Sequence, residues 1–364
     1  MKRINQYEPL IEEEEKRAVM EYLNSGGWLT EYKYTQEFER MIARQVGSKY
    51  ASAVTNGTLS LAVALMVIGL ERDAEVIVPD YTMISSANSV ILAGAKPVLV
   101  DVTPDDLCLD LEKVEAAITA KTKAIMYVSI NGRCSKMEEL LALVHRHNLL
   151  LIEDASQSFC SKYRGKCLGT FGVLGCFSFS PPKIVTTGQG GAIVSDDEEL
   201  YHKILLMKDY GRSKSGVDYY ETIGYNFKFT DLQAVIGIEQ MKKIGWRINR
   251  KKEMYKLYRD LLQDTPQIEF VETDLNDCTP WFMDLLVEKG REKLISFLNT
   301  MGIDTRPFYP AIHTQPPYAN VKGDFENSEY ISKSGLWLPS SLSLPDEDIR
   351  FVCQKIREYS KKGV

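Results

Sequence analysis

The sequence predicts an α/β protein with a large domain built on a mostly parallel sheet and a smaller α+β domain at the C-terminal end. Strand-like apolar runs alternate with helical stretches at intervals of roughly 25 residues through the first part of the chain. At 364 residues, the chain is longer than a single compact core usually accommodates. After residue 240 the alternation gives way to a basic helix and a mixed pattern. We therefore expect a large domain over residues 1–240 and a small domain over residues 241–364.

The first elements of the chain are expected to be helical. Residues 11–24 have the pattern of a helix that ends at Ser25-Gly26-Gly27, where glycine permits a left-handed cap. A second helix should contain Phe38 and Ile42. The apolar stretch 59–70 predicts a buried helix that begins near Thr58. Because a helix start leaves N–H groups without helical partners, this position is suited to binding a phosphate.

The next part of the chain predicts buried strands separated by helices. The strands are expected at residues 76–79, 97–101, 124–130, 149–154, 175–179 and 192–194. The helices are expected at residues 84–93, 111–118, 136–147 and 197–209. This alternation is typical of a parallel sheet that is covered by helices on both faces.

The C-terminal part of the chain predicts a smaller α+β unit. Its elements are expected to be a basic helix over residues 242–256, a strand at 282–287, a helix at 291–298 and a returning segment at 302–307.

Composition excludes several classes of partner. A net charge of −6 provides no basic field for nucleic acid or for an anionic membrane. We find no signal-peptide pattern and no apolar run of the roughly 18 residues that a membrane span needs. Seven cysteines are scattered without a paired framework, which suits a reducing cytoplasm. Four histidines lack metal-site spacing with them, so we expect no metal site.

The stretch 148–195 carries the predicted chemistry. One apolar run ends at Glu153-Asp154, at the strand end where open α/β sheets bind their ligands. A second run passes through Ser180-Pro181-Pro182 to Lys183, and a glycine-rich turn follows. Taken singly, Lys183 would be a surface lysine and Asp154 an ordinary strand end. Together they suit a cofactor with a ring nitrogen and an aldehyde, which is pyridoxal 5'-phosphate: Lys183 would bind the aldehyde covalently and Asp154 would keep the ring nitrogen protonated.

Three motifs in this order resemble the DegT/DnrJ/EryC1/StrS sugar aminotransferase family. They are E-D-A-S-Q from residue 153, G-x-x-G-x-F-S-F-S-P-P-K ending at Lys183, and T-T-G-Q-G-G-A-I-V-S-D-D from residue 186. Residues 224–234 also resemble the family's G-x-N-x-x-x-T-D-x-Q-A signature, although a loop followed by a capped helix would account for that stretch as well. The resemblance implies the fold-type I aminotransferase architecture with bound pyridoxal phosphate.

The resemblance also implies roles for individual residues around the cofactor. Gly57, Thr58 and Ser178 would contact the cofactor phosphate, and Gln157 its phenolic oxygen. Met83 aligns with an aromatic residue that usually stacks on the pyridine ring, whereas Tyr81 lies two positions earlier. Asn226 would reach the phosphate of the neighbouring subunit, which implies a homodimer with shared active sites.

Substrate contacts follow from two further segments. Arg306 and His313 match the family segment T-R-P-F-x-P-x-x-H-x-Q-P-x-Y, and an arginine bounded by proline can hold a substrate anion or make a structural ion pair. Residues 129–133 replace the family's usual His-x-Tyr-Gly pattern, and Arg133 there is either an anion-binding group or a solvated side chain. Gln189 stands where the family usually has glutamate.

The expected function is transfer of an amino group from glutamate, or less favourably glutamine, to a keto group of a nucleotide-linked deoxysugar. A keto-phosphate or a cyclic keto-polyol is the alternative acceptor, because the usual pocket wall is changed at residues 129–133. Dehydration at a sugar carbon is an alternative reaction, but family members of that kind replace the lysine with histidine, and this chain keeps Lys183. A cofactor-binding regulator without turnover is disfavoured by the intact residue set.

Overall fold

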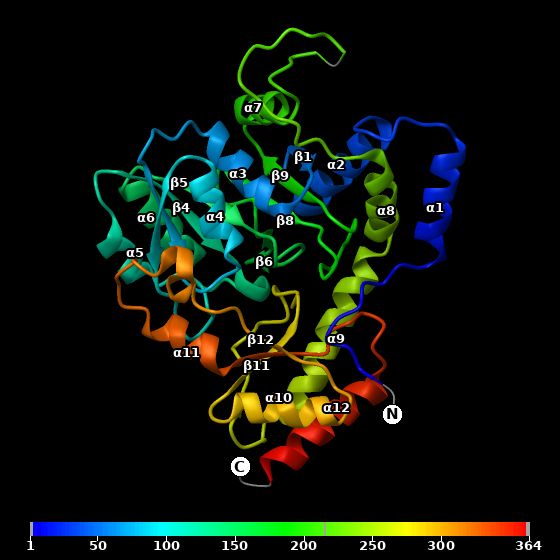
Figure 1. Ribbon diagram of the computed structural model, residues 1–364, viewed down its shortest axis with the longest axis vertical. Coiled ribbons are helices and arrows are strands. Elements are labelled where there is room, and N and C mark those ends of the chain that lie inside the picture. Colours follow the sequence, from blue (N-terminus) through cyan, green and yellow to red (C-terminus); the bar gives the residue numbers. More distant parts are fainter. Residues whose placement is uncertain (1–2, 215, 362–364) are drawn as a thin grey trace.

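Two sheets of different size organise the molecule, which a computed structural model describes at residues 3–214 and 216–361. Within those residues, seven strands form the larger sheet and four form the smaller one. Figure 1 shows the larger sheet and its helices in the upper part of the molecule and the smaller sheet below, among α10, α11 and α12.

The larger sheet is mostly parallel. Its strands lie in the order β1 (Tyr50–Val54), β9 (Gly191–Ser195), β8 (Leu174–Ser178), β5 (Leu150–Asp154), β4 (Thr122–Val128), β2 (Glu75–Pro79) and β3 (Lys96–Val100). β9 pairs antiparallel with both of its neighbours, and the pairs from β8 to β3 are parallel. The ligand-binding ends of β5 and β4 therefore lie at one edge of the sheet, as the sequence predicted.

Helices cover both faces of this sheet. They are α1 (Glu13–Asn24), α2 (Lys33–Val46), α3 (Gly57–Val67), α4 (Ser85–Leu92), α5 (Leu111–Ala117), α6 (Met137–Arg146), α7 (Glu198–Lys208) and α8 (Asp231–Lys242). Alternate residues of one strand belong to different cores: Val76 and Val78 pack with α3 and α4, while Ile77 packs with α6. Because neighbouring strand side chains point to opposite faces, an apolar run without alternation marks a strand buried on both sides.

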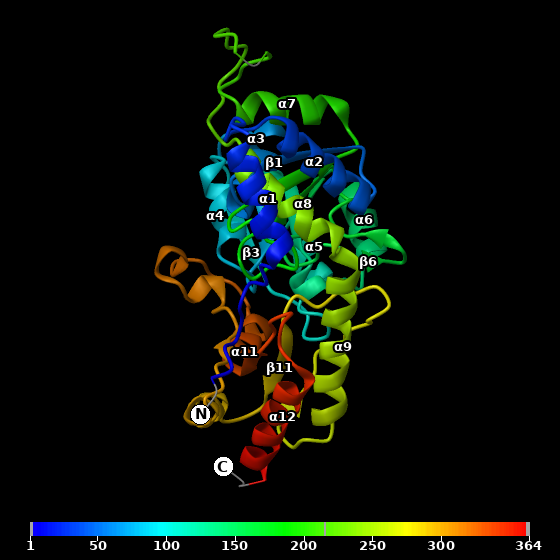
Figure 2. The same ribbon diagram turned by 90° about the vertical axis from the view of Figure 1, so that its right-hand side faces the viewer.

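The smaller sheet is antiparallel and has its own apolar core. Its strands lie in the order β10 (Ile268–Glu269), β11 (Met283–Val287), β13 (Gly335–Leu338) and β12 (Arg306–Pro307). The helices of this part are α9 (Ile244–Leu262), α10 (Arg291–Thr300), α11 (Glu326–Ser334) and α12 (Asp346–Ser360). Figure 2 shows α9 running from the large-sheet region down beside α12, and Tyr255, Tyr258 and Leu262 of α9 pack in this second core.

The α/β class, with a large mostly parallel sheet, is confirmed, and several details differ from the prediction. β1 was not predicted, and neither was the hairpin of β6 (Lys162–Tyr163) and β7 (Lys166–Cys167). Ile4 packs in the core of the small sheet, although the first residues were assigned to the large domain. The exact boundary at residue 240 stays a prediction. In the described part of the chain, no helix is both long and apolar enough to cross a bilayer.

Candidate active site

A cavity of about 490 Å³ opens at the carboxyl end of β5. Its wall combines residues from both sheets and from the loops after β2, β5 and β8. The lining residues are Asn56, Gly57, Thr58, Leu59, Met83, Ser85, Asp154, Ser156, Gln157, Ser178, Ser180, Pro182, Lys183, Gln189, Trp281, Arg306 and Tyr309. The cavity therefore contains both residues on which the predicted chemistry depends.

Asp154 is the last residue of β5, and its side chain is buried. The Ser86 hydroxyl donates to one carboxylate oxygen at 2.7 Å, and the Ser156 N–H donates to the other at 3.1 Å. Its neighbour Glu153 points to the other face of the sheet and accepts from the N–H groups of residues 169, 171 and 172. One residue of the Glu-Asp pair thus holds a loop, while the other faces the cavity.

Lys183 follows β8 in a turn, where its N–H donates to the Ser180 carbonyl at 3.0 Å. Its Nζ lies 3.8 Å from the centroid of the Trp281 ring. Burial lowers the pKa of the Lys183 amine to about 7, the Asp154 carboxylate opposes this shift, and the Arg306 guanidinium adds to it. A neutral amine, which an attack on an aldehyde requires, is therefore well populated near neutral pH.

The start of α3 forms the opposite wall. The Asn56 side chain caps the helix by accepting from the Leu59 N–H at 2.9 Å. Gly57 has no room for a side chain, because a Cβ there would lie 2.7 Å from Cβ of Ser178. The same holds at Gly191, where a Cβ would lie 2.4 Å from the Asn56 carbonyl oxygen. These contacts bring the helix start and the Ser178 hydroxyl together, as a phosphate-binding cradle requires.

Gln157 and Asn131 join the cavity to the small sheet. The Gln157 side-chain oxygen accepts from the Asn131 N–H at 3.0 Å. The Asn131 amide then pairs with the backbone of Phe282 in both directions, at 2.9 and 2.8 Å. Asn131 has a φ of 51°, a left-handed conformation that asparagine tolerates better than most residues. In this chain, residues 129–133 thus serve to connect the two sheets.

Arg306 enters the cavity from β12 and is exposed. Its guanidinium lies 5.6 Å from the Tyr309 ring centroid and 5.4 Å from that of Trp337. Stacking on aromatic rings holds the guanidinium plane while leaving its N–H groups available for an anion.

The chain is similar to known proteins over nearly its whole length. Residues 9–357 match the model of the DegT/DnrJ/EryC1/StrS aminotransferase family. The chain belongs to this family. It is 36% identical over 361 residues to a GDP-perosamine synthase of Escherichia coli O157:H7, with 99% of each chain covered. The resemblance stated from the motifs is therefore confirmed.

Solved structures agree with the family assignment. A structure of S. venezuelae DesV in complex with a ketimine intermediate has a TM-score of 0.90 and 31% identity, covering 96% of this chain and 94% of that one. An E. coli GDP-4-keto-6-deoxy-D-mannose-3-dehydratase with bound hydrated PLP has a TM-score of 0.90 and 25% identity, covering 98% and 100%. The predicted fold class and the predicted enzyme class, an aminotransferase, are confirmed by this family.

The cavity residues of this family member fit pyridoxal phosphate. The cradle between α3 and Ser178 offers backbone and hydroxyl donors for a phosphate. Asp154 offers a carboxylate and Lys183 an amine, and both line the same cavity. Met83 and Gln189 line it as well, whereas Tyr81 is buried against Phe308, with ring centroids 5.8 Å apart.

The structure corrects the predicted role of Arg133. Its Nη2 donates to both carboxylate oxygens of Asp284, at 2.7 and 2.8 Å, and its Nε donates to Thr273 at 2.8 Å. The side chain is 2% exposed and is absent from the cavity wall described above. Arg133 is a buried structural ion-pair partner because β11 places a carboxylate beside it, and no local sequence pattern reveals such a distant contact.

His313 and Asn226 also lie away from this cavity in their own chain. Nδ1 of His313 is 2.7 Å from Asp80, and its ring stacks on Phe325 at 4.5 Å. We therefore leave His313 out of the proposed substrate site. Asn226 is exposed and forms a backbone bridge with Asp209.

The groups that the sequence did not predict include Trp281 and Tyr309, which line the cavity, and Ser86, which donates to Asp154. Ser86 and Trp281 lie outside the family motifs found in the sequence, so no local pattern indicated them. Tyr309 stands three residues after Arg306, inside the matched family segment, so the aromatic side chain there was a usable signal.

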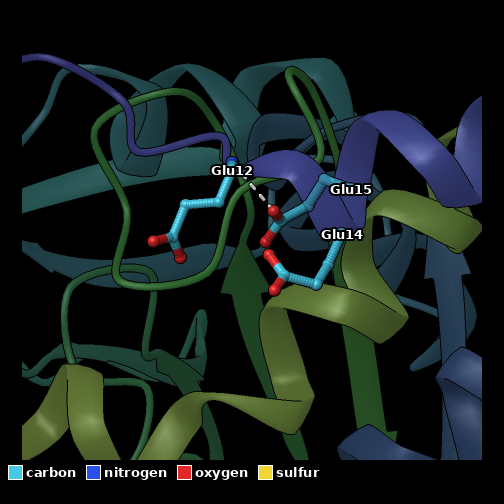
Figure 3. Close-up of side chains that lie close together, drawn as sticks. All are labelled: Glu12, Glu14 and Glu15. Carbon is cyan, nitrogen blue, oxygen red and sulfur yellow. Dashed lines mark hydrogen bonds between the residues drawn. The ribbon is translucent and has the colours of Figure 1, made fainter.

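A cluster of carboxylates at the start of α1 lies away from the active site. Figure 3 shows Glu12, Glu14 and Glu15 close together, with the Glu15 carboxylate accepting from the Glu12 N–H. The Lys243 ammonium lies 2.8 Å from Glu12, 3.1 Å from Glu14 and 3.2 Å from Glu15. Lys243 thus offsets part of the negative charge of the cluster and links α1 to the start of α9.

Proposed function

We propose that this family member is a pyridoxal-phosphate-dependent aminotransferase that moves the amino group of glutamate to a keto group of a nucleotide-linked deoxysugar. The observation that carries the proposal is the shared cavity of Asp154 and Lys183, opposite the start of α3. The relatives named GDP-perosamine synthase support a nucleotide sugar as the acceptor class.

The proposal assigns tasks to five residues that line the cavity. When bound, the cofactor supplies an electron sink for the carbon that loses or gains the amino group. Lys183 would bind the cofactor and carry the proton between substrate and cofactor, which a pKa of about 7 favours. Asp154 would keep a proton on the ring nitrogen. Gly57, Thr58 and Ser178 would hold the phosphate.

Arg306 is proposed to bind the anionic part of a substrate. The guanidinium reaches the cavity and stacks on two aromatic rings, which fixes its plane. Carboxylates and phosphates both accept two parallel hydrogen bonds from such a group. The amino donor and a sugar nucleotide each carry one of these groups, so Arg306 fits both halves of the reaction.

We also propose a homodimer in which Asn226 completes the phosphate site of the partner. Asn226 is exposed and lies in the segment between α7 and α8. The described residues of this segment before Asn226 project beyond α7 (Figure 1). That segment carries the exposed side chains of Tyr219, Tyr220 and Ile223. Such apolar exposure marks protein contact surfaces. The seven cysteines are free thiols, in keeping with the cytoplasm as the proposed location.

Dehydration of a sugar is the second candidate reaction, because a dehydratase shares the fold over the whole chain. A dehydratase must eliminate a hydroxyl group, whereas a transaminase must return a proton to the carbon that receives nitrogen. The retained Lys183 amine, held inside the cavity, favours the second task.

The deciding experiment combines cofactor trapping with a substrate panel. Borohydride reduction of the purified yellow protein should fix pyridoxal phosphate on Lys183, as read by peptide mapping. A separate, unreduced sample should convert glutamate to 2-oxoglutarate and form one amino sugar for each 2-oxoglutarate when nucleotide-linked keto-sugars are supplied. It should react more slowly with keto-phosphates or keto-polyols. A label on another lysine, or loss of the sugar hydroxyl without amine transfer, contradicts the proposal.

A further inference from the structure

Three consecutive carbonyls around the reacting lysine accept hydrogen bonds from outside the large sheet. Trp281 Nε1 donates to Pro182 at 2.6 Å, the Tyr7 hydroxyl to Lys183 at 3.3 Å and Arg247 Nη1 to Ile184 at 3.1 Å. The donors come from the N-terminal segment, from α9 and from the segment that leads into β11. The loop that carries Lys183 is therefore held from the small-sheet side of the cavity.

Trp281 makes two contacts with this loop. Its indole N–H binds the carbonyl before Lys183, and its ring face lies 3.8 Å from the Lys183 Nζ. The indole itself is firmly held, because it is 2% exposed and stacks on Phe282 with centroids 3.9 Å apart. The buried amine of Lys251, whose pKa burial lowers to about 7, donates to the Trp281 carbonyl at 2.8 Å and to the Ser340 carbonyl at 2.6 Å.

We propose that Trp281 is a positioning residue for Lys183, giving the amine a resting place whenever it is not bonded to the cofactor. This inference rests on the proposed role of Lys183. During transamination the lysine must leave the cofactor, move a proton and return. An amine that rests against a fixed aromatic face returns from one defined position, because the ring attracts its ammonium form and excludes water from its neutral form.

The groups that face the amine set its protonation. Asp154 lies on the β5 side and favours the ammonium form, whereas Arg306 on β12 disfavours it. Tyr309 is held neutral in the same wall, because burial raises its pKa, and burial likewise raises the pKa of Tyr7 to about 12. The Trp281 ring covers one side of the amine. Removing it should hydrate the amine. Because burial is the largest cause of the lowered pKa of Lys183, this hydration outweighs the lost attraction of the ring for the ammonium form and raises the pKa toward its ordinary value.

The test uses the full chain freed of its cofactor and measures the rate at which it captures pyridoxal phosphate between pH 6 and pH 10. We expect the capture rate of the wild type to rise with a midpoint near pH 7, because the Lys183 amine loses its proton there. In Trp281→Ala the pH midpoint of the capture rate should move upward by about one pH unit. In Trp281→Phe, which keeps an aromatic face but loses the N–H, the midpoint should stay and the rate should fall about five-fold.

Two controls separate positioning from a general structural role. Trp246→Phe alters an exposed tryptophan of α9 and should leave both rate and midpoint unchanged. Pyridoxamine phosphate has no aldehyde, so its affinity reports the cavity alone and should change less than about two-fold in each Trp281 variant.

The outcomes distinguish this inference from the proposed function. A wild-type midpoint in Trp281→Ala together with a wild-type rate in Trp281→Phe overturns the positioning role. The positioning role is also overturned if a Trp281 variant loses pyridoxamine phosphate affinity by the same factor as it loses capture rate, since such a loss reveals a collapsed cavity. Capture on a lysine other than 183 in the wild-type protein overturns the proposed function itself.

Discussion

Asp154 is oriented by two donors before any cofactor arrives. Ser86 and the Ser156 N–H each bind one carboxylate oxygen, so the group cannot rotate freely into the cavity. In the proposed function, this carboxylate would hold a proton on the ring nitrogen of the cofactor, which is the state that draws electrons from the substrate.

Asp154→Asn should separate cofactor capture from catalysis. The variant keeps its size and can still hydrogen-bond, but it loses its charge. We expect Lys183 to capture pyridoxal phosphate normally, because that step needs only amine and aldehyde. The glutamate half-reaction, followed by stopped-flow absorbance, should slow by two or more powers of ten, about 3 kcal/mol. A rate close to that of the wild type would mean that Asp154 does not face the ring nitrogen.

Site residues could be predicted from the sequence where a side chain with the required chemistry stands inside a short motif. Asp154, Lys183, Gly57 and Ser178 stand in short motifs, and the structure brings all of them to one cavity. Trp281 could not be predicted, because its contact with Lys183 joins positions that no local spacing relates. Arg133 was misassigned for the same reason, since its partner Asp284 lies far along the chain.

At the scale of elements, the start of α3 is the proposed site of the cofactor phosphate. The helix begins at Gly57, and its first turn packs on the end of β8 at Ser178. Both elements contribute residues to the cavity wall, and their close approach depends on the missing side chain at residue 57.

Gly57→Ala should weaken cofactor binding, because the new Cβ would lie 2.7 Å from Ser178 Cβ and force the helix away from β8. We expect the affinity for pyridoxamine phosphate to fall at least about ten-fold, measured by equilibrium titration. Gly245→Ala is the matched control. No atom lies near its Cβ position in α9, so cofactor affinity should not change and unfolding should cost up to about 1 kcal/mol more. Equal affinities in both variants would show that the close packing is dispensable.

Elements were predictable where burial is uniform along a strand. β2, β4 and β5 each contain a continuous apolar run and were expected within a few residues of their observed bounds. β1 was not, because Tyr50–Val54 consists mainly of small residues with little strand preference. Pairing with β9 makes it a strand, and this pairing is a tertiary contact.

Across the whole molecule, the pair of Arg133 and Asp284 fixes the small sheet to the large one. Arg133→Met should cost about 3–5 kcal/mol of unfolding free energy, because it leaves the Asp284 carboxylate buried without its partner. Urea unfolding measures this loss. The double variant with Asp284→Leu should recover part of it, since no uncompensated charge remains. A single variant as stable as the wild type would contradict the structural role.

The proposed homodimer gives Asn226 a testable function. Asn226→Ala should leave the fold and the dimer intact, because the side chain is exposed in its own subunit. We expect weaker cofactor retention, seen as about a ten-fold faster loss of pyridoxamine phosphate on dialysis. Sedimentation velocity provides the second readout. A fully active wild-type monomer would exclude a shared site.

The pairing of Ile4 with Ile303 has a consequence for folding. The Ile4 N–H donates to the Gly302 carbonyl at 2.8 Å, and its carbonyl accepts from the Asp304 N–H at 2.9 Å. Residue 4 therefore finds its backbone partners about 300 positions further along the chain. Tyr7, three residues after Ile4, donates to the Lys183 carbonyl. The segment that helps to hold the loop of Lys183 is thus itself anchored on the small sheet, and local folding of the large sheet alone does not complete this support.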